Sequence, residues 1–359
     1  MPMSPTYVIA EAGVNHNGSL DLGRDLIDAA AEAGADAVKF QTFRADALTT
    51  KAAPKAAYQR EATDATESQY SMLKALELSE SDHEALVEHC QKRGIQFLST
   101  PFDTESLSFL VDRFDMPRVK VPSGEITNGP LVLAAARTGR PVILSTGMST
   151  LGEVEQALGV LAFGYTAERS APPRLDAFAE AYASEDGQQA LRSRVTVLHC
   201  TTAYPTPLAE VNLRAMDTIR AAFGVAAGYS DHTVGIAVPI AAVARGATLI
   251  EKHFTTDRSL PGPDHRASLE PGELAQMVRS IRDVEAALGS AIKAPTATEL
   301  DNRSVGRKSL TAAVPISQGD VLTASNVTAQ RPGTGVSPMH YWDRLGETAG
   351  HRYETGQLL

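Results

Sequence analysis

The chain has 359 residues, of which 43% are hydrophobic and 21% charged, and this balance is typical of a globular protein with a sizeable core. Its net charge of -10, without a basic tract, argues against nucleic acid or an anionic membrane as a partner. The two cysteines, Cys90 and Cys200, form no C-x-x-C pair, which argues against a disulfide framework or a thiolate zinc site. With neither a basic leader nor an apolar run of roughly 20 residues, the sequence predicts a cytoplasmic protein.

Short apolar segments rich in β-branched residues alternate with longer segments of helical periodicity, the pattern of parallel α/β folds. The predicted strands are 7–10, 37–40, 95–99, 118–121, 141–145, 195–199, 225–230 and 248–253. Helices are predicted between them, most firmly at 22–33, 238–245 and 273–288. Eight strand-helix repeats close naturally into a TIM (β/α)8 barrel, which we expect to span residues 1–288.

Three segments interrupt this pattern. Residues 42–72 form a polar loop long enough to be a functional lid. Residues 164–192 are an acidic insertion, rich in Pro and Ala, for which a surface elaboration or an extra helix is the simplest explanation. After a polar linker over 289–304, short β-prone runs broken by Gly and Asp predict a small β-rich domain over 305–359. A domain of that size is near the lower limit for independent stability, so we expect it to need a docking partner.

The chemistry of such a barrel lies at the carboxyl ends of its strands, and all eight predicted strands end in polar residues. Lys39 and Lys120 each lie within an apolar run, where a charge is costly unless it is paired or used. Two lysines that converge on one cavity indicate a bound anion. The turns at Ser123-Gly124 and Ser145-Thr146-Gly147 add hydroxyl and N–H donors that suit a carboxylate or phosphate. For any one of these residues alone, a structural hydrogen bond is the simpler explanation.

His232 and His253 follow adjacent strands and could turn neutral imidazole nitrogens toward one divalent cation. Without a third strong protein ligand, the cation would stay open to substrate oxygens, as a Lewis acid requires. A pair of hydrogen-bonded histidines is the structural alternative.

The order of several motifs resembles one family closely. The runs IAEAGVNHNG, AVKFQTF, STPFD, VKVPSGEITN, ILSTGMST, LHCTTAYPTP, GYSDHTVGI, IEKHFT and LPGPDHRASLEP are similar to those of the sialic acid synthase family, which includes N-acetylneuraminate, legionaminate and pseudaminate synthases. The tail KSLTAAVPISQGDVLTASNVTAQRPGTGVSP resembles the antifreeze-like (SAF) domain of that family, which is related to type III antifreeze proteins. The resemblance covers nearly the whole chain outside 164–192.

The resemblance implies a transferase that condenses phosphoenolpyruvate with N-acetylmannosamine and water and releases phosphate. It implies that His232 and His253 bind a divalent cation, typically manganese, with magnesium or cobalt as alternatives. It further implies catalytic or substrate-binding roles for other residues of the barrel, which are Glu11, Lys39, Gln41, Thr100, Lys120, Ser123, Glu125, Ser145, Thr202, Tyr204, Ser230 and Asp264. Arg331 matches an arginine that the small domain delivers into a neighbouring subunit, which implies a domain-swapped homodimer.

Chemical reasoning agrees with these roles. Carbon 3 of the enol phosphate is a nucleophile, the polarised aldehyde of the sugar is its electrophile, and water then attacks carbon 2 before phosphate leaves. No side-chain nucleophile is required. A carboxylate must orient that water or move its proton, and Glu125, beside Ser123, is our candidate. A structural hydrogen bond to the loop is the alternative role for Glu125.

The particular sugar is less well specified by the sequence. Thr202 stands where several N-acetylneuraminate synthases carry asparagine, and RPGTGVSP resembles the neuraminate and legionaminate branches more than the pseudaminate branch. We therefore rank N-acetylmannosamine first and 2,4-diacetamido-2,4,6-trideoxymannose, the precursor of N,N'-diacetyllegionaminate, second. From other classes, a Schiff-base aldolase using Lys39 or Lys120 and a non-enzymatic carbohydrate- or ice-binding protein remain alternatives.

Overall fold

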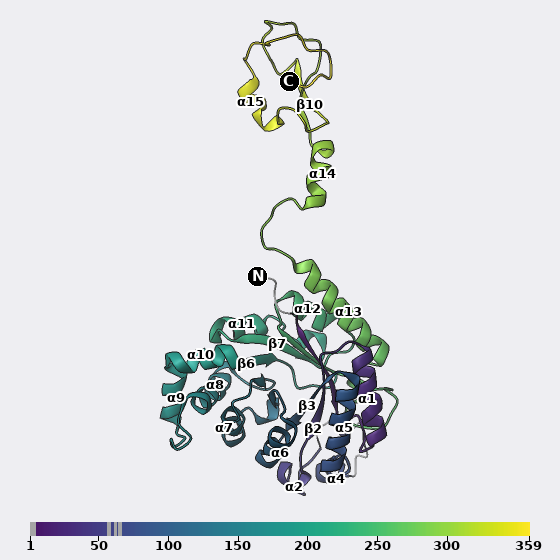
Figure 1. The fold of residues 1–359 in the computed structure, drawn as a ribbon, viewed down its shortest axis with the longest axis vertical. Coiled ribbons are helices and arrows are strands. Elements are labelled where there is room, and N and C mark those ends of the chain that lie inside the picture. The colour runs from purple at the N-terminus through teal and green to yellow at the C-terminus, as the bar shows by residue number, and fades with distance from the viewer. Residues whose placement is uncertain (1–4, 56–58, 61–62, 64–66) are drawn as a thin grey trace. The chain divides into compact units, whose positions relative to one another are not determined.

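The computed structural model describes residues 5–55, 59–60, 63 and 67–359, and the chain divides into two compact units, 1–289 and 290–359. Figure 1 shows the elements of both units. Each unit is described below by itself. Within the described residues, no helix combines the length and the apolar character that crossing a membrane requires.

Eight parallel strands form the sheet of the first unit, in the order β3-β2-β1-β8-β7-β6-β5-β4. Strands β3 and β4, at the two ends of this order, lie next to each other and close the barrel. No hydrogen-bonded ladder joins them in the described part of the chain. All eight predicted strands are present, and the predicted TIM-barrel fold is confirmed. The strands are β1 (Tyr7–Gly13), β2 (Ala37–Thr42), β3 (Gln96–Pro101), β4 (Val119–Val121), β5 (Val142–Ser145), β6 (Val195–His199), β7 (Ala226–Asp231) and β8 (Leu249–His253).

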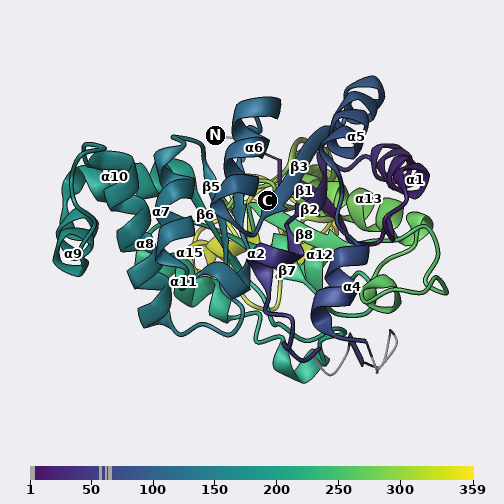
Figure 2. The same cartoon turned by 90° about the horizontal axis from the view of Figure 1, so that it is seen from below.

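The helices that follow the strands lie outside the ring (Figure 2). Helix α1 illustrates why they form: the side chain of Ser19 accepts a hydrogen bond from the N–H of Leu22, and Leu26 and Ile27 turn one apolar face into the core. The outer helices are α1 (Leu20–Glu32), α5 (Glu80–Arg93), α6 (Thr104–Phe114), α7 (Gly129–Arg137), α8 (Leu151–Thr166), α11 (Ala215–Phe223), α12 (Ala237–Ala244) and α13 (Pro271–Leu288). Short 3-10 turns are η1 (Ser123–Glu125), η2 (Leu208–Glu210) and η3 (His265–Ala267).

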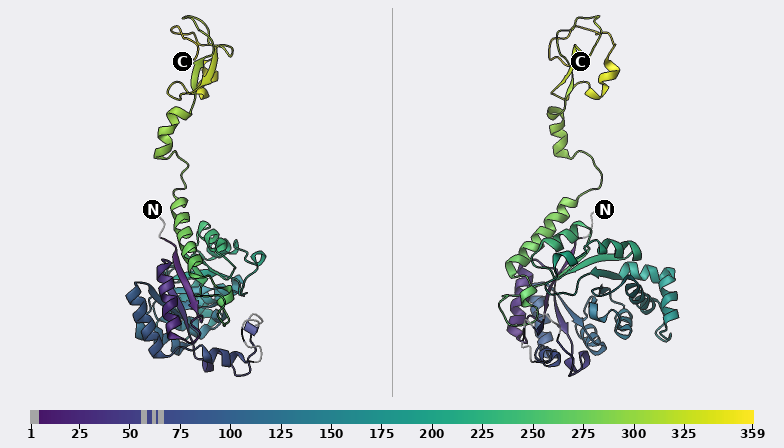
Figure 3. Two further views of the ribbon diagram at one scale, coloured as in Figure 1. Left: turned by 90° about the vertical axis from the view of Figure 1, so that its right-hand side faces the viewer. Right: turned by 180° about the vertical axis from the view of Figure 1, so that it is seen from behind.

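The two interruptions predicted within the barrel both contain helices. In the described part of 42–72, α2 (Ala45–Leu48) and α4 (Gln69–Ala75) lie at the carboxyl end of the barrel (Figure 1), whereas 56–58, 61–62 and 64–66 lie outside the described residues. The insertion over 164–192 forms α9 (Leu175–Ala183) and α10 (Glu185–Arg194) on the outer side of α8 (Figure 3). Phe178 of α9 packs edge-to-face on Phe163, with ring centroids 5.2 Å apart.

The second unit pairs β9 (Ser309–Ala312) with β10 (Val327–Gln330) in antiparallel register and adds η4 (Pro338–His340) and α15 (Tyr341–Arg344). Leu310, Ile316 and Tyr353 lie in its small core. Helix α14 (Ala297–Gly306) occupies much of the segment for which we expected only a polar linker. Thr296 and Glu299 form a capping box there, which is a helix-start signal that the polar composition concealed.

Candidate active site

A cavity of about 360 Å³ opens at the carboxyl ends of the barrel strands. Arg331 follows β10 in the second unit and is exposed, and its predicted role in a neighbouring subunit stays a prediction. All predicted site residues of the barrel line this cavity, namely Glu11, Lys39, Gln41, Thr100, Lys120, Ser123, Glu125, Ser145, Thr202, Tyr204, Ser230, His232, His253 and Asp264.

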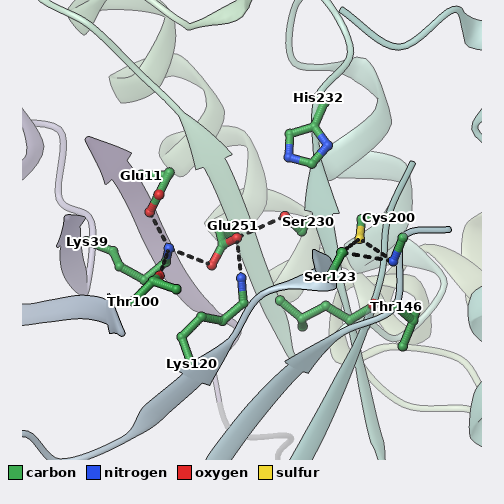
Figure 4. Close-up of polar contacts among 12 residues, drawn as sticks. Glu11, Lys39, Thr100, Lys120, Ser123, Thr146, Cys200, Ser230, His232 and Glu251 are labelled. Carbon is green, nitrogen blue, oxygen red and sulfur yellow. Dashed lines mark hydrogen bonds and ion pairs between the residues drawn. The ribbon is translucent and has the colours of Figure 1, made fainter. Parts of the chain in front are cut away.

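Two lysines and two glutamates form a buried charged cluster at the base of the cavity (Figure 4). Lys39 Nζ lies 2.5 Å from Glu11 Oε2 and 3.5 Å from Glu251 Oε2. Lys120 Nζ lies 2.9 Å from the other oxygen of Glu251. Glu251 therefore bridges both lysines, so two carboxyl groups face two ammonium groups in this cluster.

Two hydroxyl groups extend this cluster. Lys39 Nζ donates a 2.9 Å hydrogen bond to Thr100 Oγ1, and Ser230 Oγ donates one of the same length to Glu251 Oε1. These bonds fix the lysine and glutamate side chains. An anion that enters must compete with Glu11 and Glu251 for the lysine charges.

Burial and pairing act in opposite directions on these groups. Burial, only partly offset by the charge of Lys39, raises the pKa of Glu11 to about 7. Burial alone would also raise the pKa of Glu251, but the charges of Lys120 and Lys39 outweigh it and hold that pKa well below its usual range. Burial lowers the pKa of Lys39, and the neighbouring glutamates more than reverse this effect. Lys39 is therefore a cation at neutral pH.

The turns after β4 and β5 meet at a set of small polar groups beside the lysines. The N–H of Gly147 donates hydrogen bonds to Ser123 Oγ (2.9 Å) and Cys200 Sγ (3.1 Å). A Cβ at position 147 would lie 2.2 Å from Thr202 Oγ1, so any larger residue here would displace that side chain. Ser145 Oγ is buried and has no hydrogen-bond partner among the described residues. A buried hydroxyl without a partner, facing a cavity, is ready to bind a polar ligand.

The two histidines lie close together at the mouth, with ring centroids 5.5 Å apart. His232 Nδ1 is 2.7 Å from the carbonyl oxygen of Thr201, to which it donates, and this bond leaves Nε2 as an acceptor. His253 Nδ1 is buried and has no hydrogen-bond partner in the described part of the chain. Burial lowers the pKa of both imidazoles, so both are neutral.

These features fit a divalent cation. Neutral imidazoles with unshared lone pairs are suitable ligands, and the carbonyl that orients His232 is a typical outer partner of a metal-bound histidine. Across the described residues, no group of three or more His, Cys, Asp and Glu side chains is arranged to hold a metal. Any cation bound by this pair would therefore keep positions for other oxygen ligands.

Behind the cavity wall, the residues that precede the histidines form a second buried ion pair. Lys252 Nζ lies 2.6 Å from Asp231 Oδ2, and both side chains are fully buried. Because side chains alternate along a strand, Lys252 faces away from the cavity while Glu251 and His253 face into it. The pair joins the ends of β7 and β8, the strands that carry the histidines.

Glu125, Tyr204 and Asp264 line other parts of the cavity. Glu125 lies on η1 and accepts a 2.7 Å hydrogen bond from Asn128 Nδ2, which matches the structural alternative for this residue without excluding a role in the cavity. The Tyr204 ring packs against the His232 ring at a tilt of 42°, with ring centroids 4.2 Å apart. Burial raises the pKa of Asp264 to about 6.

Not every polar strand-end residue belongs to the site. Ser99 is hydrogen-bonded to Thr42, and His199 to the carbonyl oxygen of Val211, so these two stabilise the structure. Conversely, the sequence motifs assign no role to Glu251, which the structure places between the two lysines. The sequence does mark Glu251 in the way that it marks Lys39 and Lys120, because it is a charged residue within an apolar run, TLIEKH. The contribution of α2 and α4 to the cavity agrees with the functional segment predicted over 42–72, although the sequence did not show which of its side chains reach the site.

This arrangement defines a class of protein: a barrel enzyme with a cationic pocket for an anionic substrate and a histidine pair suited to a divalent cation. The NeuB family model matches residues 26–293, and the SAF domain model matches residues 307–353. The chain therefore belongs to the NeuB family and carries a SAF domain, as the sequence motifs predicted.

Individual relatives agree with this assignment. The N,N'-diacetyllegionaminic acid synthase of Campylobacter jejuni subsp. jejuni serotype O:2 is 44% identical over 357 residues, which cover 99% of each chain. The enzyme of the same name from Legionella pneumophila subsp. pneumophila is 44% identical over 98% of this chain and 93% of its own. The crystal structure of N-acetylneuraminic acid synthetase from Leptospira borgpetersenii serovar Hardjo-bovis matches with a TM-score of 0.67 and 32% identity, covering 83% of this chain and 90% of that chain. The predicted enzyme class, a nonulosonic acid synthase, is thereby confirmed.

Proposed function

We propose that this nonulosonic acid synthase makes N,N'-diacetyllegionaminate from phosphoenolpyruvate, water and 2,4-diacetamido-2,4,6-trideoxymannose. The observation that carries the proposal is the 44% identity, over nearly the full length, to two N,N'-diacetyllegionaminic acid synthases. Identity to the N-acetylneuraminic acid synthetase of known structure is 32%. The sequence motifs ranked N-acetylmannosamine first, whereas these relatives favour the second of the two predicted sugars.

The buried lysines give phosphoenolpyruvate its place in the cavity. Lys39 and Lys120 are the cations at its base, and Ser123 and Ser145 offer hydroxyl groups beside them. Charge-assisted hydrogen bonds from lysine to carboxylate or phosphate are about twice as strong as neutral ones. Ser145, buried and without a partner among the described residues, gains a hydrogen bond only when a ligand is present.

The condensation needs no covalent intermediate with the protein. Carbon 3 of phosphoenolpyruvate forms a bond to the aldehyde carbon of the open-chain sugar, and the aldehyde oxygen takes up a proton. Water then adds to carbon 2, and the bond from carbon 2 to the phosphate oxygen breaks, so that phosphate leaves with the electron pair. The chain's task is to place the two substrates and to move protons.

Two carboxyl groups are placed for the proton transfers. Glu11 pairs in register with His253 and contacts Lys39, so it lies between the proposed aldehyde and phosphoenolpyruvate positions. We assign it to the aldehyde oxygen. Glu125 lines the cavity next to Ser123, and we keep it as the group that orients the attacking water.

His232 and His253 would hold a divalent cation, for which we propose manganese. When bound, such a cation supplies Lewis acidity toward a carbonyl oxygen. Tyr204, packed against His232, restricts the orientation of that ring. The carbonyl of Thr201 fixes its tautomer.

The contacts of the lysines disfavour the Schiff-base alternative. An amine nucleophile must lose its proton, but Lys39 contacts Glu11 and Glu251, and Lys120 contacts Glu251. These pairs favour the charged ammonium. Borohydride trapping with pyruvate tests this point, and a covalent adduct would contradict our mechanism.

The direct test is product formation from phosphoenolpyruvate and manganese with each sugar in turn, followed by mass spectrometry of the product and release of phosphate. We expect turnover of the trideoxy sugar, loss of turnover with a chelator, and no turnover by His232→Ala. Turnover of N-acetylmannosamine alone would make the protein an N-acetylneuraminate synthase with the mechanism unchanged. Activity that is independent of metal would contradict the assignment of the histidines.

A further inference from the structure

One side of the cavity is apolar, and neither phosphoenolpyruvate nor a cation accounts for it. The side chains come from the β1–α1 loop, from the residue after β3, and from helices α2 and α4. We call this surface the apolar wall, and it consists of Val14, Leu48, Met72, Leu73, Leu76 and Phe102.

The apolar wall is backed by its own small core, separate from the main core of the barrel. Met72 and Leu76 are buried in this core against Phe43. Phe43 in turn packs edge-to-face on Phe102, with ring centroids 6.0 Å apart. A surface supported in this way keeps its shape before a ligand arrives, so its contacts cost little ordering entropy.

Polar bonds also hold the two helices of the wall together. Tyr70 on α4 donates a 2.8 Å hydrogen bond to Asp46 on α2. The N–H of Ala45, at the start of α2, donates to Glu77, just beyond α4. The two helices therefore behave as one piece of the wall.

The other walls of the cavity determine which part of the sugar reaches this surface. The aldehyde end must lie at His232 and His253, and the lysines take the anionic substrate. We assign the distal carbons of the open-chain sugar, C4 to C6, to the side formed by α2 and α4, because the apolar side chains of the cavity gather there. Thr49 and Gln69, hydrogen-bonded to each other at 3.2 Å, also line this side and supply polar groups.

We infer that the apolar wall selects the sugar by its distal half, accepting a methyl group at C6 and the acetamido group at C4, and disfavouring hydroxyl groups at those positions. This inference rests on the proposed function. The trideoxy sugar presents two methyl groups to the wall that N-acetylmannosamine lacks. Gln69 can match the amide of the acetamido group, because both groups carry a donor and an acceptor.

The size of the selection follows from burial and from hydrogen bonding. One methyl or methylene group in an apolar pocket changes kcat/KM by about 10-fold or more. A hydroxyl group placed against the wall would also lose water without gaining a partner on that surface. We therefore expect the wild-type protein to prefer the trideoxy sugar over N-acetylmannosamine by at least about 10-fold in kcat/KM.

The test compares kcat/KM for the two sugars in the full-length protein and in variants of the wall. Leu73→Gln places an amide on the wall at a half-buried position, and we expect it to lower the preference for the trideoxy sugar at least about 10-fold. Leu48→Gln places an amide on the wall from α2, and it provides the test of the inference if Leu73→Gln fails to fold. Leu73→Met preserves the apolar surface and should retain the preference.

Ala47→Gln is the matched control, because Ala47 lies on α2, is exposed and does not line the cavity. The ratio of kcat/KM values for the two sugars in this variant should stay within about 2-fold of the wild-type ratio, because substitutions at exposed positions usually have effects of this size or smaller. If the wild-type protein uses the trideoxy sugar and both glutamine variants keep the full preference, the inference is wrong and the proposed function stands. If the wild-type protein turns over only N-acetylmannosamine, the proposed function and the inference are both wrong.

Discussion

Glu251 offers a quantitative test of the charged cluster, through the substitution Glu251→Gln. This glutamate is 4% exposed and contacts Lys120 at 2.9 Å and Lys39 at 3.5 Å. Glutamine keeps the shape and one acceptor for Lys120 but leaves the cluster with two ammonium groups and the single carboxylate of Glu11. The cluster then carries at least one uncompensated buried positive charge.

Removing one partner of a buried ion pair costs about 3–5 kcal/mol, and we take about 3 kcal/mol because the glutamine oxygen can still accept a hydrogen bond. At about 2 °C per kcal/mol for a unit of this size, the melting temperature should fall by roughly 6 °C. Differential scanning calorimetry in the absence of substrate measures this shift. Phosphoenolpyruvate should narrow the gap to wild type, because its negative charge replaces the lost carboxylate.

Glu125→Gln is the matched control. Glu125 lines the same cavity but contacts Asn128 rather than either lysine, so this substitution should change the unfolding free energy of the protein by less than about 1 kcal/mol. Equal melting temperatures for Glu251→Gln and wild type would refute the idea that Glu251 balances the lysine charges. If phosphoenolpyruvate leaves the difference in melting temperature between Glu251→Gln and wild type unchanged, the assignment of the anion to those lysines is refuted.

Four further outcomes are expected. His232→Ala should abolish high-affinity manganese binding in an electron paramagnetic resonance titration, and unchanged affinity would contradict the histidine pair. Gly147→Ala should raise KM for phosphoenolpyruvate, because the new Cβ would lie 2.2 Å from Thr202 Oγ1; an unchanged KM would place the substrate elsewhere. Burial raises the pKa of Asp264 to about 6, so the protonated carboxyl group stabilises the folded protein below about pH 4, and this stabilisation is lost as the pH rises to about 6. In urea titrations, Asp264→Asn should therefore gain stability relative to wild type as the pH rises through that window, by up to about 3 kcal/mol. A difference in unfolding free energy that does not change with pH would contradict the pKa shift. Arg331→Ala should lose turnover while light scattering shows an unchanged dimer, whereas full turnover, or an active monomer, would contradict the proposed exchange of domains.

Much of the fold was predictable because it depends on short-range patterns. Each barrel strand is an apolar run buried on both faces, and runs such as TLIEKH and AVKF stand out from the helical segments around them. Helix α14 was missed because its composition is polar and its stability signal is a capping box rather than an apolar stripe. For the segment that forms α9 and α10, the sequence predicted at most one extra helix. These two helices are stabilised by packing on α8, and this long-range contact has no local signal in the sequence.

The sequence by itself determined which residues end the strands, and therefore that lysines, histidines and hydroxyl groups would gather at one end of a barrel. Only the tertiary structure decided the partner of each charge. Lys120 and Glu251 are 131 residues apart in the chain, and neither residue carries a local sign of the other. The tertiary structure also separated Glu251, which faces the cavity, from Lys252, which is buried behind it with Asp231, and placed the apolar side chains of α2 and α4 over the same site. Ion pairs and cavity walls depend on long-range packing, whereas strands and their ends follow from the local alternation of apolar and polar residues.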